Sequence, residues 1–144
     1  MLTVGCPQRC ARKGGYGAFL LHDPTTACRI VDTLHQGLNI PVTCKIRLLP
    51  SLEETISFAK GLENNGCQLL TVHGRTKEQK GENLGKCNWE SIREIRRHIN
   101  IPLIANGGNP SVDYIDRCLE ATQADGAMVG WPVLQNPLFF LGQS

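Results

Sequence analysis

The hydrophobic residues of this chain follow two different periods, which alternate along its length. Short and mostly apolar runs predict buried strands at residues 42–47, 68–73, 102–106 and 126–130. Around them, apolar residues recur every three or four positions, which predicts amphipathic helices at residues 24–37, 52–65, 89–99 and 112–119. Because no hairpin signal joins two strands, this order predicts an α/β fold with a parallel sheet and helical crossovers.

Capping residues mark the start of two of these helices. Asp23 precedes Pro24, so the aspartate can cap a helix whose first position holds the proline. Ser51 and Glu54 have the spacing of a capping box. Residues 74–86 are rich in glycine and lysine and are expected to form a loop.

Four residues at or near the predicted strand ends recur with the period of a βα unit. Lys45, His73, Asn106 and Gly130 are separated by 28, 33 and 24 positions, and one such unit takes roughly 30 residues. In a (β/α)8 barrel the carboxyl ends of the strands carry the active site. Taken singly, a lysine at a strand end can be a solvated surface group and a histidine can be structural. Their common position favours a shared site.

Alternation within the strands predicts which face of the sheet carries this site. Thr43, Lys45 and Arg47 fall on one side of their strand, opposite the apolar set. Thr71 and His73 share a face in the next strand. Because helices cover the outside of a barrel, we expect these polar faces to line its interior.

Composition narrows the class of protein. The chain has 144 residues, a formal charge of +2 and 41% hydrophobic residues, which is ordinary for a globular protein with one core. No apolar run approaches the ~20 residues of a membrane helix, and no signal peptide is visible. We therefore expect no membrane association and a cytoplasmic location, with the nucleus and organelles as alternatives.

The seven cysteines are odd in number and irregularly spaced, so they are expected to be reduced thiols. None has the C-x-x-C spacing of a zinc site, and the close pair Cys6 and Cys10 is the weak exception; no metal site is expected. Cys6 stands out because a proline follows it and a basic stretch with three glycines, residues 9–18, comes next. This context predicts a loop that approaches something anionic, with the thiol acting as an acid or a nucleophile.

Glycines follow the last two predicted strands, in the segments Asn106-Gly107-Gly108 and Met128-Val129-Gly130. Barrels commonly bind a phosphate at the loops after strands seven and eight, where glycines let backbone N–H groups approach it. A phosphorylated cofactor is the functional interpretation, and a simple tight turn at Gly107-Gly108 is the alternative.

The chain resembles the tRNA-dihydrouridine synthases, the flavoenzymes that reduce uridine in the D loop of tRNA. The resemblance rests on four ordered segments, namely residues 5–8 with 14–20, 41–47, 67–76 and 101–107, and extends over most of residues 4–137. Residues 67–81 look most similar to the eukaryotic branch that acts on the 5′ side of the D loop.

This resemblance implies a (β/α)8 barrel with FMN across its C-terminal mouth and NADPH or NADH as the reductant. Lys45 and His73 would contact the flavin ring or ribityl chain, and Cys6 would be the general acid that protonates uracil C5 after hydride transfer to C6. The FMN phosphate would be held by residues Asn106, Gly107, Gly108, Gly130 and Trp131. The tRNA phosphates would meet Arg47, Arg75 and Lys77, for which solvated charge is the alternative.

The chain also departs from the family pattern. A full barrel takes ~250 residues, so residues 1–144 are expected to form only its C-terminal half or so. We expect these residues to lack the first three strands of the barrel and the C-terminal helical tRNA-binding domain of the family. Trp131 stands where many members place arginine. Open barrel edges and an exposed apolar interior face would favour self-association. An inactive remnant that binds RNA or a partner, and another FMN-dependent barrel, are the alternative functions.

Overall fold

The computed structural model describes residues 1–6, 8–108 and 111–141. Pro7, which follows Cys6, and the Asn109-Pro110 turn lie outside the described residues. The strands are β1 Leu2–Val4, β2 Thr43–Leu48, β3 Leu69–Thr76, β4 Leu103–Asn106 and β5 Gly126–Met128. The helices are α1 Arg9–Gly14, α2 Pro24–Gly37, α3 Leu52–Asn64, α4 Trp89–His98, α5 Val112–Thr122 and α6 Trp131–Gln135. Short 3-10 turns lie at Gly17–His22, Gly81–Asn83 and Phe139–Leu141.

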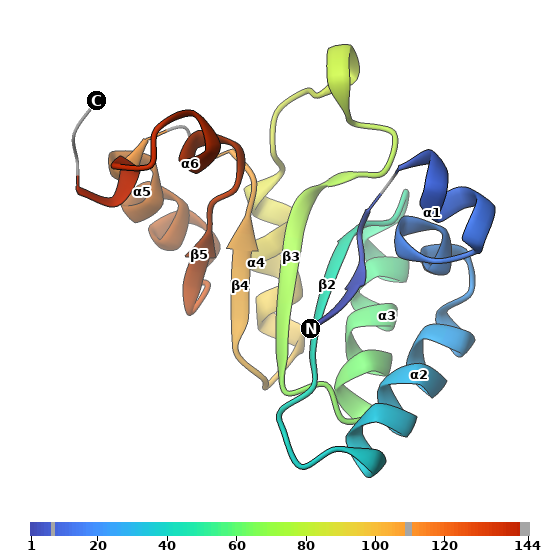
Figure 1. Cartoon of the computed structure of the whole chain (residues 1–144). Helices are drawn as coiled ribbons and strands as arrows, with labels where there is room; N and C mark the ends of the chain where they lie inside the picture. Colours follow the sequence, from blue (N-terminus) through green and yellow to red (C-terminus); the bar gives the residue numbers. More distant parts are fainter. Residues whose placement is uncertain (7, 109–110, 142–144) are drawn as a thin grey trace.

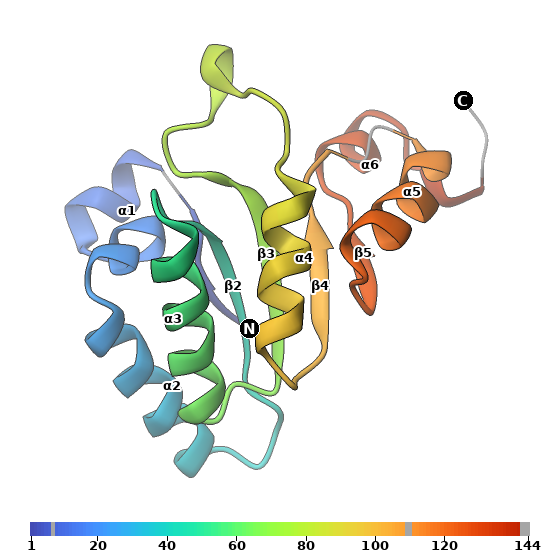
Figure 2. The same ribbon diagram turned by 180° about the vertical axis from the view of Figure 1, so that it is seen from behind.

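All five strands are parallel and lie in the order β1-β2-β3-β4-β5 (Figure 1). Helices α2, α3 and α4 cover one face of this sheet, which Figure 2 shows from behind. The predicted parallel sheet with helical crossovers is thus confirmed. The carboxyl ends of the strands meet at one edge, beside the loop that follows β3.

The core lies between the sheet and these helices. In β2, residues Cys44, Ile46 and Leu48 are buried, whereas Thr43, Lys45 and Arg47 are half-buried on the open face. This alternation confirms the predicted division of the strand into an apolar and a polar face. In register, Lys45, Thr71 and Ile104 form one row of the open face, and Arg47, His73 and Asn106 form the next. The expectation of an apolar interior face is therefore wrong for these two rows, because five of their six residues are polar.

The segment after Cys6 differs from its prediction. Residues 9–14 were expected to lie in a loop but form α1, and Gly17–His22 add a 3-10 turn. Ala11 is buried, and its carbonyl accepts a hydrogen bond from the Tyr16 N–H at 3.1 Å. Gly15, with φ of +65°, lets the chain reverse directly after the helix. The burial of Ala11 and the turn at Gly15 therefore stabilise this helix, although the segment has only a weak hydrophobic period.

The predicted helix starts are confirmed. The Asp23 carboxylate accepts the Thr26 N–H at 3.0 Å, and the Ser51 hydroxyl accepts the Glu54 N–H at 3.3 Å. Element ends shift by a few residues: β3 continues past His73 to Thr76, and β5 ends at Met128. No helix of the described residues is long and apolar enough to cross a membrane.

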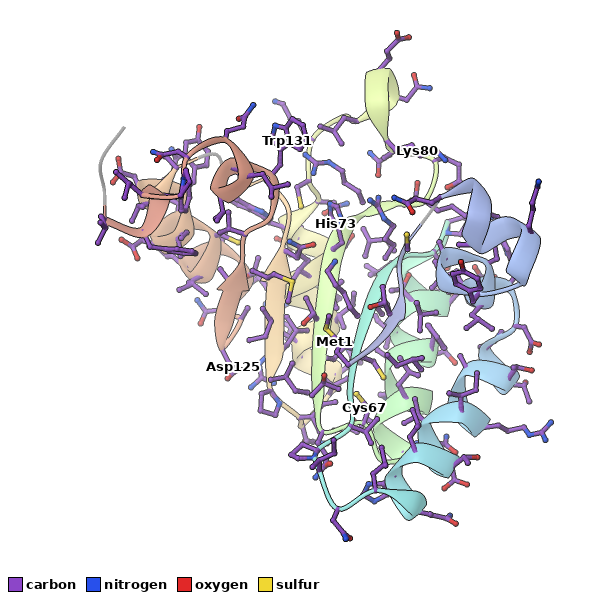
Figure 3. All side chains as sticks on the ribbon, in the orientation of Figure 1. Met1, Cys67, His73, Lys80, Asp125 and Trp131 are labelled. Atoms are coloured by element: carbon purple, nitrogen blue, oxygen red, sulfur yellow. The ribbon has the colours of Figure 1, made fainter. Side chains whose placement is uncertain are left out.

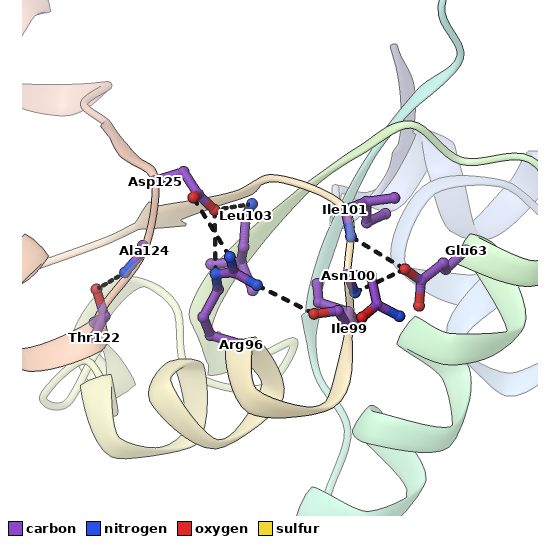
Figure 4. A network of polar contacts seen from close by, with 9 residues as sticks. All are labelled: Glu63, Arg96, Ile99, Asn100, Ile101, Leu103, Thr122, Ala124 and Asp125. Atoms are coloured by element: carbon purple, nitrogen blue, oxygen red, sulfur yellow. Dashed lines mark hydrogen bonds and ion pairs between the residues drawn. The ribbon is translucent and has the colours of Figure 1, made fainter.

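A polar network closes the amino-terminal end of the sheet (Figure 4). Glu63 accepts the N–H groups of Asn100 and Ile101 at 2.8 and 3.1 Å. Asp125 accepts the Leu103 N–H at 2.8 Å and pairs with Arg96 at 3.2 Å. These side chains satisfy the backbone donors that lead into β4, so this end of the molecule is structural.

Candidate active site

Two of the four residues predicted at the strand ends, His73 and Asn106, are register partners in neighbouring strands. Arg47 of β2 and Met128 of β5 complete their row, whereas Lys45 lies one row earlier, opposite Thr71, and Gly130 lies beyond β5. This row occupies the carboxyl-terminal edge of the open face, where Figure 3 marks His73. The sheet therefore brings together residues that are separated by up to 81 positions in the sequence.

Lys45 and Asn106 form the centre of this group. Lys45 Nζ donates to Asn106 Oδ1 at 2.7 Å, and Asn106 Nδ2 donates to the Met128 carbonyl at 2.8 Å. Burial, helped by the nearby charge of Arg47, lowers the pKa of Lys45 to about 8. The ammonium is therefore still mostly protonated at neutral pH, but it gives up its proton more easily than an ordinary lysine.

His73 is held in its neutral form. Burial, together with the positive charges of Arg47, Lys45 and Arg75, lowers the pKa of His73 to about 3. Arg75 Nη1 lies 3.3 Å from His73 Nε2. Because a guanidinium can only donate, we assign Nε2 as the acceptor and place the ring proton on Nδ1. His73 can thus donate from Nδ1 but does not act as an acid at neutral pH.

Gly107 and Gly108 continue from Asn106 with positive φ angles of +97° and +79°. A Cβ on Gly107 would lie 2.7 Å from His73 Cδ2, and one on Gly108 would lie 2.9 Å from Cys87 Cβ. Trp89 Nε1 donates to the Gly107 carbonyl at 3.2 Å, and the Cys87 thiol donates to the Asn106 carbonyl at 3.6 Å. Both glycines are therefore required by the local packing, and two side chains support the turn.

Cys6 lies directly after β1, at the same end of the sheet, and is half-buried. Its carbonyl accepts the Ala18 N–H at 2.9 Å. Gly17 has φ of +64°, and a Cβ there would lie 2.7 Å from that carbonyl. The backbone of Cys6 is thus packed tightly against the 3-10 turn that follows α1.

The three residues expected at the RNA surface have different surroundings. Arg47 is half-buried and donates to backbone carbonyls, while Arg75 donates from Nε to the Gly85 carbonyl at 3.2 Å. Lys77 contacts His22, lies 5.8 Å from the Phe19 ring centroid and is 3.7 Å from the Glu78 carboxylate. Each of the three side chains is therefore engaged within the chain rather than extended into solvent.

Gly130 and Trp131 lie further out than the other predicted residues. Gly130 caps α6, is exposed, and has open space where a Cβ would be. The Trp131 side chain is 70% exposed. Since α6 directly follows β5, both residues stand next to the strand that pairs with β4, but neither packs into the Lys45–Asn106 group.

Three supporting residues were not predicted as part of the site. Gln79, Cys87 and the Trp89 indole connect the loop after β3 to the strand ends. Gln79 lies within the segment that resembles the family but had no expected role, Cys87 matches no motif, and Trp89 was expected only as the first residue of the helix at residues 89–99. Their roles depend on contacts between distant segments, which spacing along one chain does not reveal.

A cavity of about 610 Å³ lies beside this group rather than within it. Its walls come from the ends of β2 and β3, the first turns of α3 and α4 and the loop before α4, and include Leu48, Leu52, Cys87 and Trp89. We place the site at the polar group on the open face, because that is where the perturbed lysine and histidine converge.

Hydroxyl and glycine groups in the site fit a phosphorylated flavin. The Thr71 hydroxyl is buried on the open face, in the row between Lys45 and Ile104, without a hydrogen-bond partner among the described residues. The Gly107-Gly108 turn presents backbone without side chains, as a phosphate cradle requires. Lys45, Arg47 and Arg75 supply positive charge for an anion.

Solved structures with a similar arrangement include mandelate oxidases. One of them, a mandelate oxidase mutant with benzaldehyde, matches with a TM-score of 0.53 and 18% sequence identity, covering 70% of this chain and 35% of that chain. A second, with 3,3-difluoro-2-hydroxy-3-phenylpropionic acid, matches with a TM-score of 0.51 and 17% identity, covering 67% and 34%. At these identities the likeness concerns the fold alone.

Curated relatives are more similar in sequence. A rat protein named tRNA-dihydrouridine(16/17) synthase [NAD(P)(+)]-like is 45% identical over 143 residues, which is 99% of this chain and 33% of the relative. The Saccharomyces cerevisiae tRNA-dihydrouridine(16/17) synthase [NAD(P)(+)] is 41% identical, over 99% of this chain and 34% of its own length. A human tRNA-dihydrouridine(20a/20b) synthase [NAD(P)+]-like protein is 34% identical, over 98% and 44%. The chain thus spans about a third of the length of the first relatives.

The family model described as dihydrouridine synthase (Dus) matches residues 2–144. The five parallel strands with helical crossovers are accordingly part of a (β/α)8 barrel. With its family match covering nearly the whole sequence, the chain belongs to the dihydrouridine synthase family.

Proposed function

We propose that this chain is part of an enzyme that reduces uridine to 5,6-dihydrouridine in the D loop of tRNA, using FMN and NADPH or NADH. The observation that carries the proposal is the convergence of Lys45, His73 and Asn106 beside the Gly107-Gly108 turn. The names of the relatives, which specify tRNA, dihydrouridine and NAD(P), support it.

FMN would be held by the residues of this group. Lys45 and His73 would meet its ring or ribityl region, and the backbone at Asn106, Gly107 and Gly108 would meet its phosphate, with Gly130 and Trp131 alongside. When bound, FMN supplies the hydride that uracil C6 receives. The positive charge crowded at Lys45, Arg47 and Arg75 is suited to an anionic group, because none of the three pairs with a carboxylate of the described residues.

Lys45 stabilises negative charge in this proposal. Its ammonium is half-buried, so its interaction with an anion is less screened than at the surface. Asn106 orients it through the 2.7 Å hydrogen bond. Lys45 would thus favour the enolate that develops on uracil when a hydride adds to C6.

Cys6 is the general acid in this proposal. Its Sγ gives a proton to uracil C5, so hydride at C6 and proton at C5 together account for the two hydrogens added. Its place beyond β1, beside β2, supports access to a base that enters the open face. Cys6 would then be reprotonated from solvent.

Residues 1–144 would form the FMN-binding part of the catalytic domain. Strands β1–β5 would correspond to the last five strands of the barrel, and the helical tRNA-binding domain of the family would lie outside these residues. Arg75 and Lys77, at the loop after β3, would contact tRNA phosphates from the same end. We propose a cytoplasmic location for this work.

The test measures flavin binding and uridine reduction separately. Purified chain is titrated with FMN by absorbance and fluorescence, and dihydrouridine is then measured in tRNA with NADPH or NADH and the full-length enzyme that contains these residues. We expect Cys6→Ala to bind FMN normally and to lose most of the reduction, while Cys28→Ala, a half-buried thiol away from the strand ends, keeps it. Full reduction by Cys6→Ala would contradict the role of the thiol. FMN binding without any reduction by the full-length enzyme that contains this chain would contradict the activity.

A further inference from the structure

Arg47 connects three segments at the carboxyl end of the sheet. Its Nε donates to the Gly5 carbonyl at 3.0 Å, and its Nη1 donates to the carbonyls of Thr76 and Gln79 at 2.8 and 3.3 Å. Gly5 directly follows β1, Thr76 ends β3, and Gln79 lies in the next loop. Because β1 and β3 are the two neighbours of β2, one side chain in the middle strand ties both of them together.

The chemistry of this position requires a guanidinium. Burial, together with the charge of Arg75, lowers the pKa of Arg47, so the charged group is held where solvation is poor. Three carbonyl oxygens offset that cost. A planar guanidinium donates to these carbonyls from two separate nitrogens, Nε and Nη1, in fixed directions, whereas a lysine ammonium has all of its N–H groups on one nitrogen.

The two peptide groups around Cys6 are both fixed. On one side, the carbonyl of Gly5 accepts from Arg47; on the other, the carbonyl of Cys6 accepts from the Ala18 N–H at 2.9 Å. Thr76 and Gln79, whose carbonyls also accept from Arg47, are held to each other, because Gln79 Oε1 accepts the Thr76 N–H at 2.9 Å. The position of Cys6 is therefore connected through Arg47 to the start of the loop between β3 and α4.

We propose that Arg47 is a positioning residue, which holds Cys6 in place for proton transfer and connects it to residues 76–79 of the loop after β3. The proposal rests on the proposed function for the role of the thiol. It replaces the expectation that Arg47 serves to bind RNA phosphates, because two of its three nitrogens are engaged with backbone carbonyls.

Hydrogen exchange tests the positioning without any assay of activity. In Arg47→Lys and Arg47→Met, we expect the Ala18 amide to exchange about tenfold faster or more, because its acceptor Cys6 is no longer held. The Leu70 amide, which donates to the Pro102 carbonyl at 3.0 Å in the core, should be unchanged. Arg96→Met is the matched control, since Arg96 also donates to a carbonyl, that of Ile99, but at the amino-terminal end. It should leave Ala18 exchange unaltered.

Two results of this experiment would overturn the proposal. Unchanged exchange at Ala18 in both Arg47 variants would show that the tether does not hold Cys6. Equal acceleration at Ala18 and Leu70 in both variants would show that Arg47 stabilises the whole fold instead. If only Arg47→Met loses the core protection, Arg47→Lys, which keeps the charge, decides the question.

Kinetics distinguishes positioning from RNA binding. For uridine reduction in tRNA, Arg47→Lys should lower kcat by about 10- to 100-fold, as expected for a displaced catalytic group, and leave the KM for tRNA unchanged. A raised KM at constant kcat would overturn the proposal in favour of RNA contact. If the full-length enzyme that contains this chain reduces no uridine, the proposed function fails, and the exchange experiment still decides whether Arg47 positions Cys6.

Discussion

At the scale of single residues, the open face concentrates positive charge in a place with little water. Lys45 and Arg47 have pKa values lowered by burial, and His73 is kept neutral by burial and by its cationic neighbours. Such an arrangement costs free energy in the isolated chain, because like charges are held close together. An anionic group bound among them would relieve this cost, so the charge pattern supports the proposed binding site.

The lowered pKa of Lys45 predicts pH-dependent anion binding. The ammonium is present below pH 8 and is lost as the pH rises through about 8, where an ordinary lysine would stay charged up to about 10.5. FMN affinity should therefore fall as the pH rises from about 7 to about 9. In Lys45→Met the affinity should be weaker at neutral pH and nearly independent of pH over this range, whereas Lys60→Met, exposed on α3, should behave as the unchanged chain does. If FMN affinity fell with pH as steeply in Lys45→Met as in the unchanged chain, this role of Lys45 would be contradicted.

At the scale of elements, the sequence correctly predicted strands, helices and caps that depend on neighbouring residues. It did not predict features that depend on contacts between distant segments. The alternation in β2 and the caps Asp23 and Ser51 are properties of a few adjacent residues, and they were predicted correctly. Helix α1 was missed because the burial of Ala11, rather than any apolar period, stabilises it. The shared edge of Lys45, His73 and Asn106 was predictable from the βα period, but the Lys45–Asn106 bond and the Arg47 connections were not.

Two glycines after neighbouring strands offer a matched test of the β4 turn. Gly107→Ala should lower the free energy of unfolding by about 2 kcal/mol or more, because alanine is strained at positive φ. Its Cβ would also lie 2.7 Å from the His73 ring. Gly130 has φ of −125°, and a Cβ there would meet open space. Gly130→Ala should therefore change the free energy of unfolding by no more than about 0.5 kcal/mol. Urea denaturation of both variants measures the difference, and equal losses would show that the turn at Gly107 is not constrained as described.

At the scale of the whole molecule, the two ends of the sheet carry different kinds of residues. The amino-terminal end is closed by Glu63, Arg96 and Asp125, which pair with backbone groups and, for Arg96 and Asp125, with each other. The carboxyl-terminal end carries the perturbed lysine and histidine and the positive φ angles of the glycine turn. This is the division expected of a (β/α)8 barrel, in which stability and chemistry are placed on opposite faces.

The open sheet predicts that this chain associates with itself in solution. Strands β1 and β5 are at the two edges, and the side of each that pairs with no strand of the described residues offers backbone groups to another strand. Next to β5, the segment 131–141 exposes large apolar side chains, including Phe140 at 64% and Leu141 at 69%. Burial of such surface against a second copy would be favourable, at about 25 cal/mol per Å² of apolar area.

Sedimentation velocity over a range of concentrations measures this association. The unchanged chain should sediment faster than a 15.8 kDa monomer, and the double variant Phe140→Lys and Leu141→Lys should shift toward the monomer. Ile40→Lys is the matched control, because Ile40 is exposed to a similar degree but lies in the loop between α2 and β2. A monomer at every concentration, with a cooperative thermal transition, would show that the open edges are protected within the chain itself and that its five strands form an independent folding unit.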